Sequence, residues 1–313
     1  MLTSPLGYPQ RVFVEADKLS PQIEYKNYDP WSLPSYTSCH VRQNASDLAT
    51  GGGWADSDHP AEYELAHKRY TFYGAEETSD GRSLRTLSEA GLVFLKHPSL
   101  GLSLPLNPWI RTGLGGRGNL GKWGPNHAAD PIVIRFNRSK LLLEFVAIKR
   151  HDNGEWAIPG GMVDAGEYVT ETLKREFKEE AGSKNSAALL DSIFSDGGHI
   201  VFQGCNKLDN RTTDFAWIET SVRLFFPNNN ETNELILTTS AESPAVKWMA
   251  FADMCEHTMF SDHQRYLNKA HIMAQPLLHS MIFKWILAQE IPSIAEELKK
   301  RKRLTNESET YIS

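Results

Sequence analysis

Beyond Pro131 the hydrophobic residues of the chain fall into short runs of the kind that build a sheet. The first two runs are separated by four polar residues, Asn137–Lys140, and predict an antiparallel hairpin. Short apolar runs farther along the chain predict three more strands. The five expected strands span Ile132–Phe136, Leu141–Lys149, His199–Gly204, Phe215–Phe226 and Val246–Phe251.

Two other stretches are amphipathic with helical spacing. Val169–Ala181 carries Leu173 and Phe177 four residues apart, which predicts an apolar face opposite the glutamates of the same stretch. Asp262–Ala274 predicts a second helix, with an amphipathic extension over Leu277–Arg303. Strands mixed with helices in this way predict a compact fold of the α/β or α+β class.

The first hundred residues differ from the rest of the chain. They are rich in Pro, Tyr, Ser and charged residues and lack long periodic elements, which predicts a smaller loop-rich domain or a wrapping extension. A length of 313 residues also favours about two domains. We therefore expect an N-terminal domain over residues 1–120, a larger domain over 121–275 and a helical, basic extension over 276–313.

A glycine-rich segment, Arg111–Gly124, joins the two expected domains and contains six glycines in fourteen residues. Within it, Gly113–Gly118 matches the G-x-G-x-x-G pattern of dinucleotide-binding folds, which needs a strand before it and a helix after it. Prolines precede the pattern, and the residues Gly121–Pro125 that follow cannot open a helix. We therefore interpret the segment as a turn-rich connector.

Composition narrows the functional classes. A hydrophobic fraction of 40% excludes a disordered chain, and a net charge of −6 disfavours general nucleic-acid binding. Three widely spaced cysteines show neither a disulfide framework nor a metal-binding spacing, which fits a reducing compartment. The most apolar stretch, Pro276–Ala288, contains His279 and Lys284 and is too short to span a membrane, and no signal or transit peptide is visible, so we expect a cytoplasmic protein.

The helix predicted at Val169–Ala181 carries the most informative chemistry. Glu176, Glu179 and Glu180 stand at positions i, i+3 and i+4, so their carboxylates repel one another unless a cation lies between them. Oxygen ligands in this number suit Mg²⁺ or Mn²⁺. Glu167 precedes the helix and can fold back toward the cluster, while the planar guanidinium of Arg175 can hold a carboxylate in place.

The spacing around this helix is G-x5-E-x7-R-E-U-x-E-E-x-G, where U is apolar, and it resembles the signature of the Nudix hydrolases. It is carried by Gly161, Glu167, Arg175, Glu176, Phe177, Glu179, Glu180 and Gly182. One position departs from the signature, because Ser183 stands where the family has a bulky aliphatic residue. A chance match of this length in one chain is on the order of one in a million.

Further segments are similar to the eukaryotic ADP-ribose pyrophosphatase type of this family, and equally to the homologous C-terminal domain of the ADP-ribose-gated melastatin-type cation channels. These segments are Arg111–Leu114, Trp123–Pro131, Phe145–Arg150, Glu155–Asp164 and Ala216–Thr220. The resemblance implies a two-domain protein with a Nudix α/β/α sandwich that contains a mixed sheet. The glycine-rich joint with Arg111 and Arg117 indicates that the smaller N-terminal domain contributes to substrate binding, and a flexible linker with solvated arginines is the competing interpretation. The resemblance also implies Mg²⁺-dependent hydrolysis of ADP-ribose to AMP and ribose 5-phosphate.

Site residues follow from the resemblance together with the residue chemistry. Glu176, Glu179 and Glu180 are expected to ligate the metal, supported by Glu167 and by the backbone of Gly161, and Arg175 is expected to take part in catalysis. The expected substrate contacts are Arg111, Arg117, Asn126, Asp130, Trp156, Gly160, Arg211, Asp214 and His263. For Trp156 a place in the core is the competing interpretation, and for His263 a surface position without a role.

Two alternatives to ADP-ribose hydrolysis stay open at this point. The chain can be an ADP-ribose-sensing domain of a TRP-type cation channel or a domain associated with one, in which ligand binding is the output. It can also be a Nudix hydrolase of another nucleoside diphosphate derivative, because the acidic signature fixes the pyrophosphate chemistry and not the flanking groups. The complete acidic cluster favours catalysis.

Overall fold

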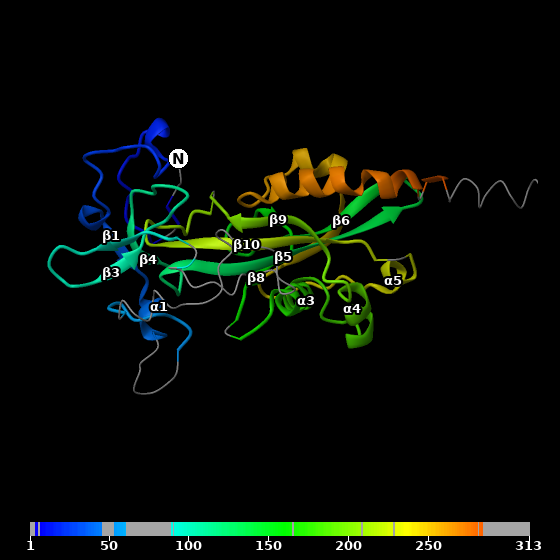
Figure 1. The fold of residues 1–313 in the computed structure, drawn as a ribbon. Helices are drawn as coiled ribbons and strands as arrows, with labels where there is room; N and C mark the ends of the chain where they lie inside the picture. Colours follow the sequence, from blue (N-terminus) through cyan, green and yellow to red (C-terminus); the bar gives the residue numbers. More distant parts are fainter. Residues whose placement is uncertain are drawn as a thin grey trace, which may run out of the picture.

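The computed structural model describes residues 4–5, 7–45, 53–60, 89, 91–164, 166–207, 209–227, 229–280 and 282–283 (Figure 1). Its centre is a mixed sheet with the strand order β11-β6-β5-β10-β9. The strands are β5 (Gly124–Asn137), β6 (Leu142–Lys149), β9 (His199–Cys205), β10 (Ala216–Phe225) and β11 (Ala245–Ala250). Strands β5 and β10 run parallel, whereas the other neighbours on this path run antiparallel.

Two short strands extend this sheet next to the predicted site. Strand β7 (Trp156–Ala157) pairs with β6, and β8 (Gly161–Met162) pairs with β5, where Ala129 lies opposite Gly161. The turn between β7 and β8 therefore leads into a strand that lies beside Ala128 and Ala129 of β5, the longest strand of the sheet.

Helices cover both faces of the sheet (Figure 1). Helices α3 (Val169–Glu180) and α4 (Ala187–Ile193) pack on one face around Phe177 and Phe194, and a helix over residues 263–280 packs on the other around Tyr266. The remaining elements of this part are α5 (Asn229–Glu234) and the 3-10 helix η3 (Phe251–Glu256). The α/β class and the three-layer α/β/α arrangement expected from the sequence are confirmed.

The described N-terminal residues form short elements joined by loops, as expected. They are the 3-10 helices η1 (Ala16–Lys18) and η2 (Pro30–Ser32), helix α1 (Cys39–Gln43), and strands β1 (Ser35–Thr37), β2 (Phe94–Lys96), β3 (Ser103–Pro105) and β4 (Gly115–Gly118). Strand β1 pairs in parallel with β4, and β2 pairs antiparallel with β3. A small cluster of Leu104, Trp123 and Phe215 joins this part to the starts of β5 and β10.

The five expected strands and both helices are present, but three expectations were wrong in detail. Strand β5 begins at Gly124 and not at Ile132, because its first ten residues pair in parallel with β10. The glycine-rich connector contains strand β4, although no helix follows it, so the dinucleotide interpretation stays excluded. The sequence did not predict the short helix α4.

The C-terminal helix agrees with its prediction over the described residues. Its described residues, 263–280 and 282–283, are helical, and residues 284–303 of the expected extension lie outside the described part of the chain. Within that described part, no helix combines the length and the apolar character that crossing a bilayer requires.

The packing of α3 on the sheet predicts a large loss of stability when Phe177 is truncated. Its ring is fully buried, with its centroid 5.5 Å from that of Phe194. We expect Phe177→Ala to lower the free energy of unfolding by about 3–5 kcal/mol, because the change leaves a cavity between helix and sheet. Urea unfolding measures this difference. The control Ile272→Ala removes a side chain that is 73% exposed and should change the free energy by less than about 0.5 kcal/mol.

Candidate metal and substrate site

Helix α3 brings two of the predicted metal ligands into contact with the β7–β8 turn. The backbone amide of Gly160 donates to Oε2 of Glu180 at 2.8 Å, and the carboxylate of Glu176 lies against Gly161 so closely that a Cβ atom there would overlap it. A Cβ atom on Gly160 would likewise overlap the carboxylate of Asp130 on β5. The two glycines are therefore required, since they let three carboxylates approach one backbone turn.

The buried stripe of α3 corrects the expected placement of its glutamates. Leu173 and Phe177 were expected opposite the glutamates, but Glu176 and Glu180 belong to the same buried face as these apolar residues. Glu179 alone of the three glutamates is exposed, with 58% of its side chain accessible. Successive helical residues are about 100° apart, so positions 173, 176, 177 and 180 form one stripe of about 100°.

Burial sets the proton affinity of this pair. It raises the pKa of Glu176 to about 7 and that of Glu180 to about 8, because a charged carboxylate loses its hydration there. Arg175 lowers the pKa of Glu176, and the amide of Gly160 lowers that of Glu180, but neither offsets the effect of burial. Without a further cation, both carboxyls keep their protons up to neutral pH.

Arg175 links the acidic residues of the site. Its Nε and Nη2 atoms donate to the two oxygens of Glu167 at 2.8 and 2.9 Å, so the guanidinium grips this carboxylate with two parallel bonds. Its Nη1 donates to Glu176 at 2.7 Å and to Glu179 at 3.2 Å, and Nη2 also donates to the carbonyl of Met162 at 2.9 Å. The prediction that Arg175 holds a carboxylate in place is thus confirmed by its two hydrogen bonds to Glu167.

These bonds account for the opposite electrostatic behaviour of Glu167. Burial alone would raise the pKa of its carboxyl, but hydrogen bonds from Arg175 and Thr172 lower it to about 2. The interaction with Glu167 also raises the pKa of the Arg175 guanidinium. Glu167 is therefore ionised at every physiological pH, whereas Glu176 and Glu180 are not.

Asp130 is the third buried carboxyl at this turn. Burial raises its pKa to about 6, and the hydroxyl of Thr220 on β10 donates to its Oδ2. Its charge also raises the pKa of Glu176, which places the two carboxyls within electrostatic range of each other. The structure therefore brings Asp130 together with Gly160, Gly161 and Glu176, as a substrate or metal contact requires.

The carboxyl oxygens next to the β7–β8 turn are of the kind that a hard divalent cation binds, but in this structure they accept hydrogen bonds from Arg175 and Gly160. Among the residues that the structure describes, no three His, Cys, Asp or Glu side chains are arranged as a ready metal cage. The reason is visible in the contacts: Nη1 of Arg175 lies between Glu176 and Glu179, and Glu180 is bonded to Gly160. Buried carboxyls next to backbone carbonyls match the oxygen ligands that Mg²⁺ and Mn²⁺ take.

Arg211 and His263 lie beside the same turn. Arg211 is held by Asp209, to which its Nε and Nη2 donate at 2.9 and 2.7 Å, and its charge lowers the pKa of Asp130. His263 is buried and accepts a hydrogen bond at Nδ1 from the amide of Ile158 at 3.2 Å. Burial lowers the pKa of His263 to about 3, so the ring is neutral and positions the backbone that leads to Gly160. His263 is thus not the surface residue of the competing interpretation.

Two other predicted arginines bind protein groups. Arg111 donates to four backbone carbonyls, those of Lys18, Ser20, Pro21 and Ile23, at 2.7 to 3.3 Å. This guanidinium therefore holds the N-terminal loop and does not point at the acidic turn.

Arg117 is enclosed even more completely, because its side chain has no exposed surface. It donates to the carbonyls of Asp56 and Gly121 and to the carboxylate of Asp58, and it lies 5.1 Å from the ring centroid of Trp123. Such a guanidinium fixes the fold of the N-terminal part, and in this structure no surface of it is open to a phosphate.

Asn126 and Asp214 also have their polar atoms occupied by the protein. Asn126 accepts from the amide of Lys122 at 2.8 Å and donates to three carbonyls. Asp214 accepts from the amide and hydroxyl of Thr112 at 2.7 and 2.6 Å and from the hydroxyl of Tyr28 at 2.6 Å. Asp214 thereby joins the two parts of the chain, whereas the partners of Asn126 all lie in the second part.

Trp156 is partly buried, packs against the core and lies next to a cation. It pairs with Lys149 on β6, contacts the core cluster of the sheet, and has Nζ of Lys247 4.5 Å from its ring centroid. The competing interpretation of Trp156 as a core residue therefore describes this structure better than a stack on adenine.

Two charged residues next to the site were missed in the sequence. Asp209 is buried and orients Arg211, and Arg150 lowers the pKa of Asp130, Glu180 and Asp209 from the end of β6. Arg150 is gripped by Asp152 at 2.9 and 2.7 Å, just as Arg211 is gripped by Asp209. A carboxylate two residues away from each arginine was a readable signal of this arrangement.

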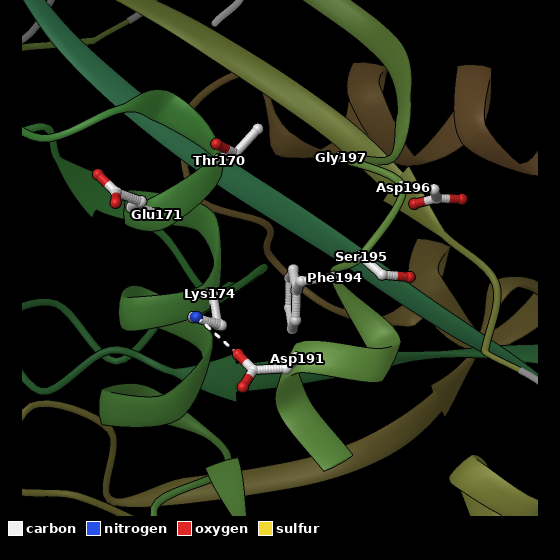
Figure 2. A pocket seen from close by; sticks show the side chains of 8 residues that line it. All are labelled: Thr170, Glu171, Lys174, Asp191, Phe194, Ser195, Asp196 and Gly197. Carbon is white, nitrogen blue, oxygen red and sulfur yellow. Dashed lines mark hydrogen bonds and ion pairs between the residues drawn. The ribbon is translucent and has the colours of Figure 1, made fainter. Parts of the chain in front are cut away.

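A separate hollow of about 430 Å³ lies at the start of α3, beside α4 (Figure 2). Figure 2 shows Lys174 from α3 facing Asp191 from α4, and their side chains form an ion pair at 2.8 Å. Glu171, which also lines the hollow, accepts from the amide of Tyr168 at 2.9 Å and so caps the helix. This hollow contains none of the predicted site residues.

Comparison with known proteins identifies the same acidic helix and glycine turn as part of a NUDIX domain. Residues 125–270 match the NUDIX domain. The chain is 48% identical over 166 residues to nudix hydrolase 6 of Caenorhabditis elegans, covering 52% of this chain and 62% of that protein. It is 35% identical over 292 residues to the mitochondrial ADP-ribose pyrophosphatase of Rattus norvegicus, covering 85% of this chain and 75% of that enzyme.

A cation channel is also among the relatives. The chain is 43% identical over 262 residues to transient receptor potential cation channel subfamily M member-like 2 of Nematostella vectensis, covering 78% of this chain but 16% of the channel. The chain thus spans less than two thirds of the nematode protein and a small part of the channel. Because the similarity to the rat enzyme covers most of both chains and includes the acidic helix with its glycine turn, this chain belongs to the NUDIX family.

Proposed function

We propose that this chain hydrolyses the pyrophosphate of ADP-ribose to AMP and ribose 5-phosphate with Mg²⁺, or Mn²⁺ in its place. In this reaction water adds to one phosphorus, the bond from that phosphorus to the bridging oxygen breaks, and the leaving phosphate keeps the bridging oxygen. The similarity to an enzyme named ADP-ribose pyrophosphatase, over 85% of this chain, supports the choice of substrate.

The observation that carries the proposal is the group of buried carboxyls at the glycine turn. Glu176, Glu180 and Asp130 have raised pKa values because burial removes the hydration of their charged forms. A bound divalent ion would supply that charge and would stabilise the negative phosphoryl oxygens of the substrate. Glu179 accepts a hydrogen bond from Arg175 at 3.2 Å, but its side chain is exposed, so it is available as a further ligand.

The residues of the chain have separate tasks in this proposal. Arg175 holds Glu167 and Glu176 and ties α3 to the carbonyl of Met162, which keeps the carboxylates aligned with β8. Arg211, already oriented by Asp209, binds phosphate oxygens of the substrate. The neutral His263 holds the backbone before Gly160 and takes no proton at neutral pH.

A channel-associated ADP-ribose sensor is the second candidate, and the similarity to the Nematostella channel favours it. Binding without cleavage needs no aligned carboxylates, whereas here all four glutamates of the signature are present and three are linked through Arg175. We therefore place hydrolysis first. The boundaries near residues 120 and 275, the cytoplasmic location and the absence of nucleic-acid partners stay predictions from the sequence.

Removal of charge from the acidic helix tests the metal site. We expect Glu180→Gln and Glu179→Gln to lower kcat for ADP-ribose by about two orders of magnitude or more, because the charge that stabilises the transition state is lost. Glu171→Gln is the matched control on the same helix, since its carboxylate caps the helix and lies outside the site. Steady-state kinetics at saturating Mg²⁺ measures the effect. Near-normal turnover in both site variants would contradict the assignment.

Substrate choice is tested by the ratio of kcat/KM values over a panel of nucleoside diphosphate derivatives. ADP-ribose should exceed NADH, sugar nucleotides and dinucleoside polyphosphates at the same Mg²⁺ concentration, with AMP and ribose 5-phosphate as the products. An equal or higher value for any rival would leave a NUDIX hydrolase with another substrate. Tight binding of ADP-ribose without product would favour the sensor.

The pKa values predict how Mg²⁺ affects stability at different pH. Glu176 and Glu180 have folded-state pKa values of about 7 and 8, above the ordinary 4.5. The stability that these groups contribute is complete below the ordinary value and is lost as pH rises through 7 and 8. We therefore expect Mg²⁺ to raise Tm more at about pH 8.5 than at about pH 6, where the ion competes with protons.

Thermal unfolding with Mg²⁺ and with a chelator, at both pH values, measures this difference. The double variant Glu176→Gln/Glu180→Gln should show a much smaller Mg²⁺ effect on Tm at either pH. An equal Mg²⁺-induced rise at both pH values in the unaltered protein would show that these carboxyls are not the ligands.

A further inference from the structure

Residues Gly113–Gly118 of the glycine-rich segment, which the proposed chemistry does not use, contact residues 8–12 near the N-terminal end of the chain. Val12 donates its amide to the carbonyl of Gly113 at 2.9 Å and lies so close that a Cβ atom on Gly113 would overlap its backbone. A Cβ atom on Gly118 would overlap the ring and hydroxyl of Tyr8. Both glycines have positive φ angles, 70° and 60°, so they provide the close approach that residues 8–12 need.

From this position the N-terminal residues contact the loop that carries Arg211. Arg11 donates from Nη2 to the carbonyl of Asn210 at 2.6 Å and from Nη1 to the carbonyl of Thr112 at 3.3 Å. The hydroxyl of Tyr8 donates to the carbonyl of Arg211 at 3.3 Å and accepts from the amide of Asn119 at 2.5 Å. Each side chain therefore bridges the glycine-rich segment and the loop over residues 209–212.

The same loop is held from its other side by Asp209. This buried carboxylate accepts from the backbone amide of Arg211 at 2.9 Å as well as from its guanidinium. The amide and side chain of Arg211 are thus fixed by Asp209, while its carbonyl and that of Asn210 are fixed by the N-terminal residues. A loop held on both sides can keep an arginine in one orientation before the substrate arrives.

We propose that Tyr8 and Arg11 are positioning residues for Arg211, and that the glycine-rich segment exists to seat them against its loop. This rests on the proposed function, in which Arg211 binds phosphate oxygens of ADP-ribose. Substrate binding depends on the N-terminal residues through the backbone of loop 209–212, without any contact between residues 8–12 and the substrate. Loss of the hydrogen bonds from Tyr8 or from Arg11 makes loop 209–212 more mobile. Part of the binding free energy of the substrate is then needed to order Arg211, so the affinity falls.

The test separates KM from kcat in the full chain. Arg11→Ala and Tyr8→Phe should each raise KM for ADP-ribose by about five- to tenfold, the effect of losing one useful hydrogen bond. The value of kcat should change by less than about twofold, because Glu176 and Glu180 lie on α3 and not on this loop. Arg11→Lys keeps one donor and should recover part of the affinity.

Tyr36→Phe is the matched control for Tyr8→Phe. The rings of Tyr36 and Tyr8 pack with centroids 4.9 Å apart, but among the described residues the Tyr36 hydroxyl makes no bond to loop 209–212. Tyr36→Phe should leave KM unchanged, while Tm measured for every variant shows that the fold is kept. If Tyr8→Phe and Tyr36→Phe change KM equally, the bridge is not the cause and the proposal is overturned.

A double-mutant cycle with Arg211→Lys distinguishes this inference from the proposed function. In the Arg211→Lys background, Arg11→Ala should raise KM by less than about twofold further, because it acts through Arg211. If Arg211→Lys raises KM and Arg11→Ala does so by the same factor in both backgrounds, the positioning role is wrong and the substrate contact stands. If Arg211→Lys leaves KM unchanged, the substrate contact is wrong and the positioning role falls with it.

Discussion

The site depends on one guanidinium that holds three carboxylates in a small volume. Arg175 donates to Glu167 before α3 and to Glu176 and Glu179 in the second half of α3, so it offsets the repulsion between these carboxylates when they ionise. The same group bonds the carbonyl of Met162, so the position of the helix relative to β8 and the separation of the carboxylates are set together. An arginine suits this task because its planar fork donates in several fixed directions at once.

The glycine turn adds the second constraint. Gly160 and Gly161 leave no room for side chains because Asp130 and Glu176 occupy that space, and the amide of Gly160 bonds Glu180. Carboxyls from a strand and a helix thereby meet at one point of backbone. Their burial makes them costly to ionise, and in the proposed function a bound divalent cation would offset that cost.

The N-terminal part contributes through backbone contacts more than through charges aimed at a ligand. The guanidinium groups of Arg111 and Arg117 donate hydrogen bonds to carbonyls and to a carboxylate of the N-terminal part itself. Tyr8 and Arg11 instead reach carbonyls of the loop next to Arg211. Arg111 and Arg117 therefore stabilise the N-terminal part itself, whereas Arg11 holds the loop next to Arg211.

The sequence by itself determined the acidic helix and the five main strands, because helical and strand periodicity are local properties. It also indicated that Arg175 can hold a carboxylate, and the structure shows that Glu167 is the one gripped with two bonds. Only the tertiary structure decided that the guanidinium groups of Arg111 and Arg117 are occupied by protein groups and that Arg211 lies beside the acidic turn. The partners of Arg111 and Arg117 are mainly backbone carbonyls, most of them tens of residues away, which no side-chain pattern marks. The early start of β5 at Gly124 likewise depends on pairing with β10, more than ninety positions later in the chain.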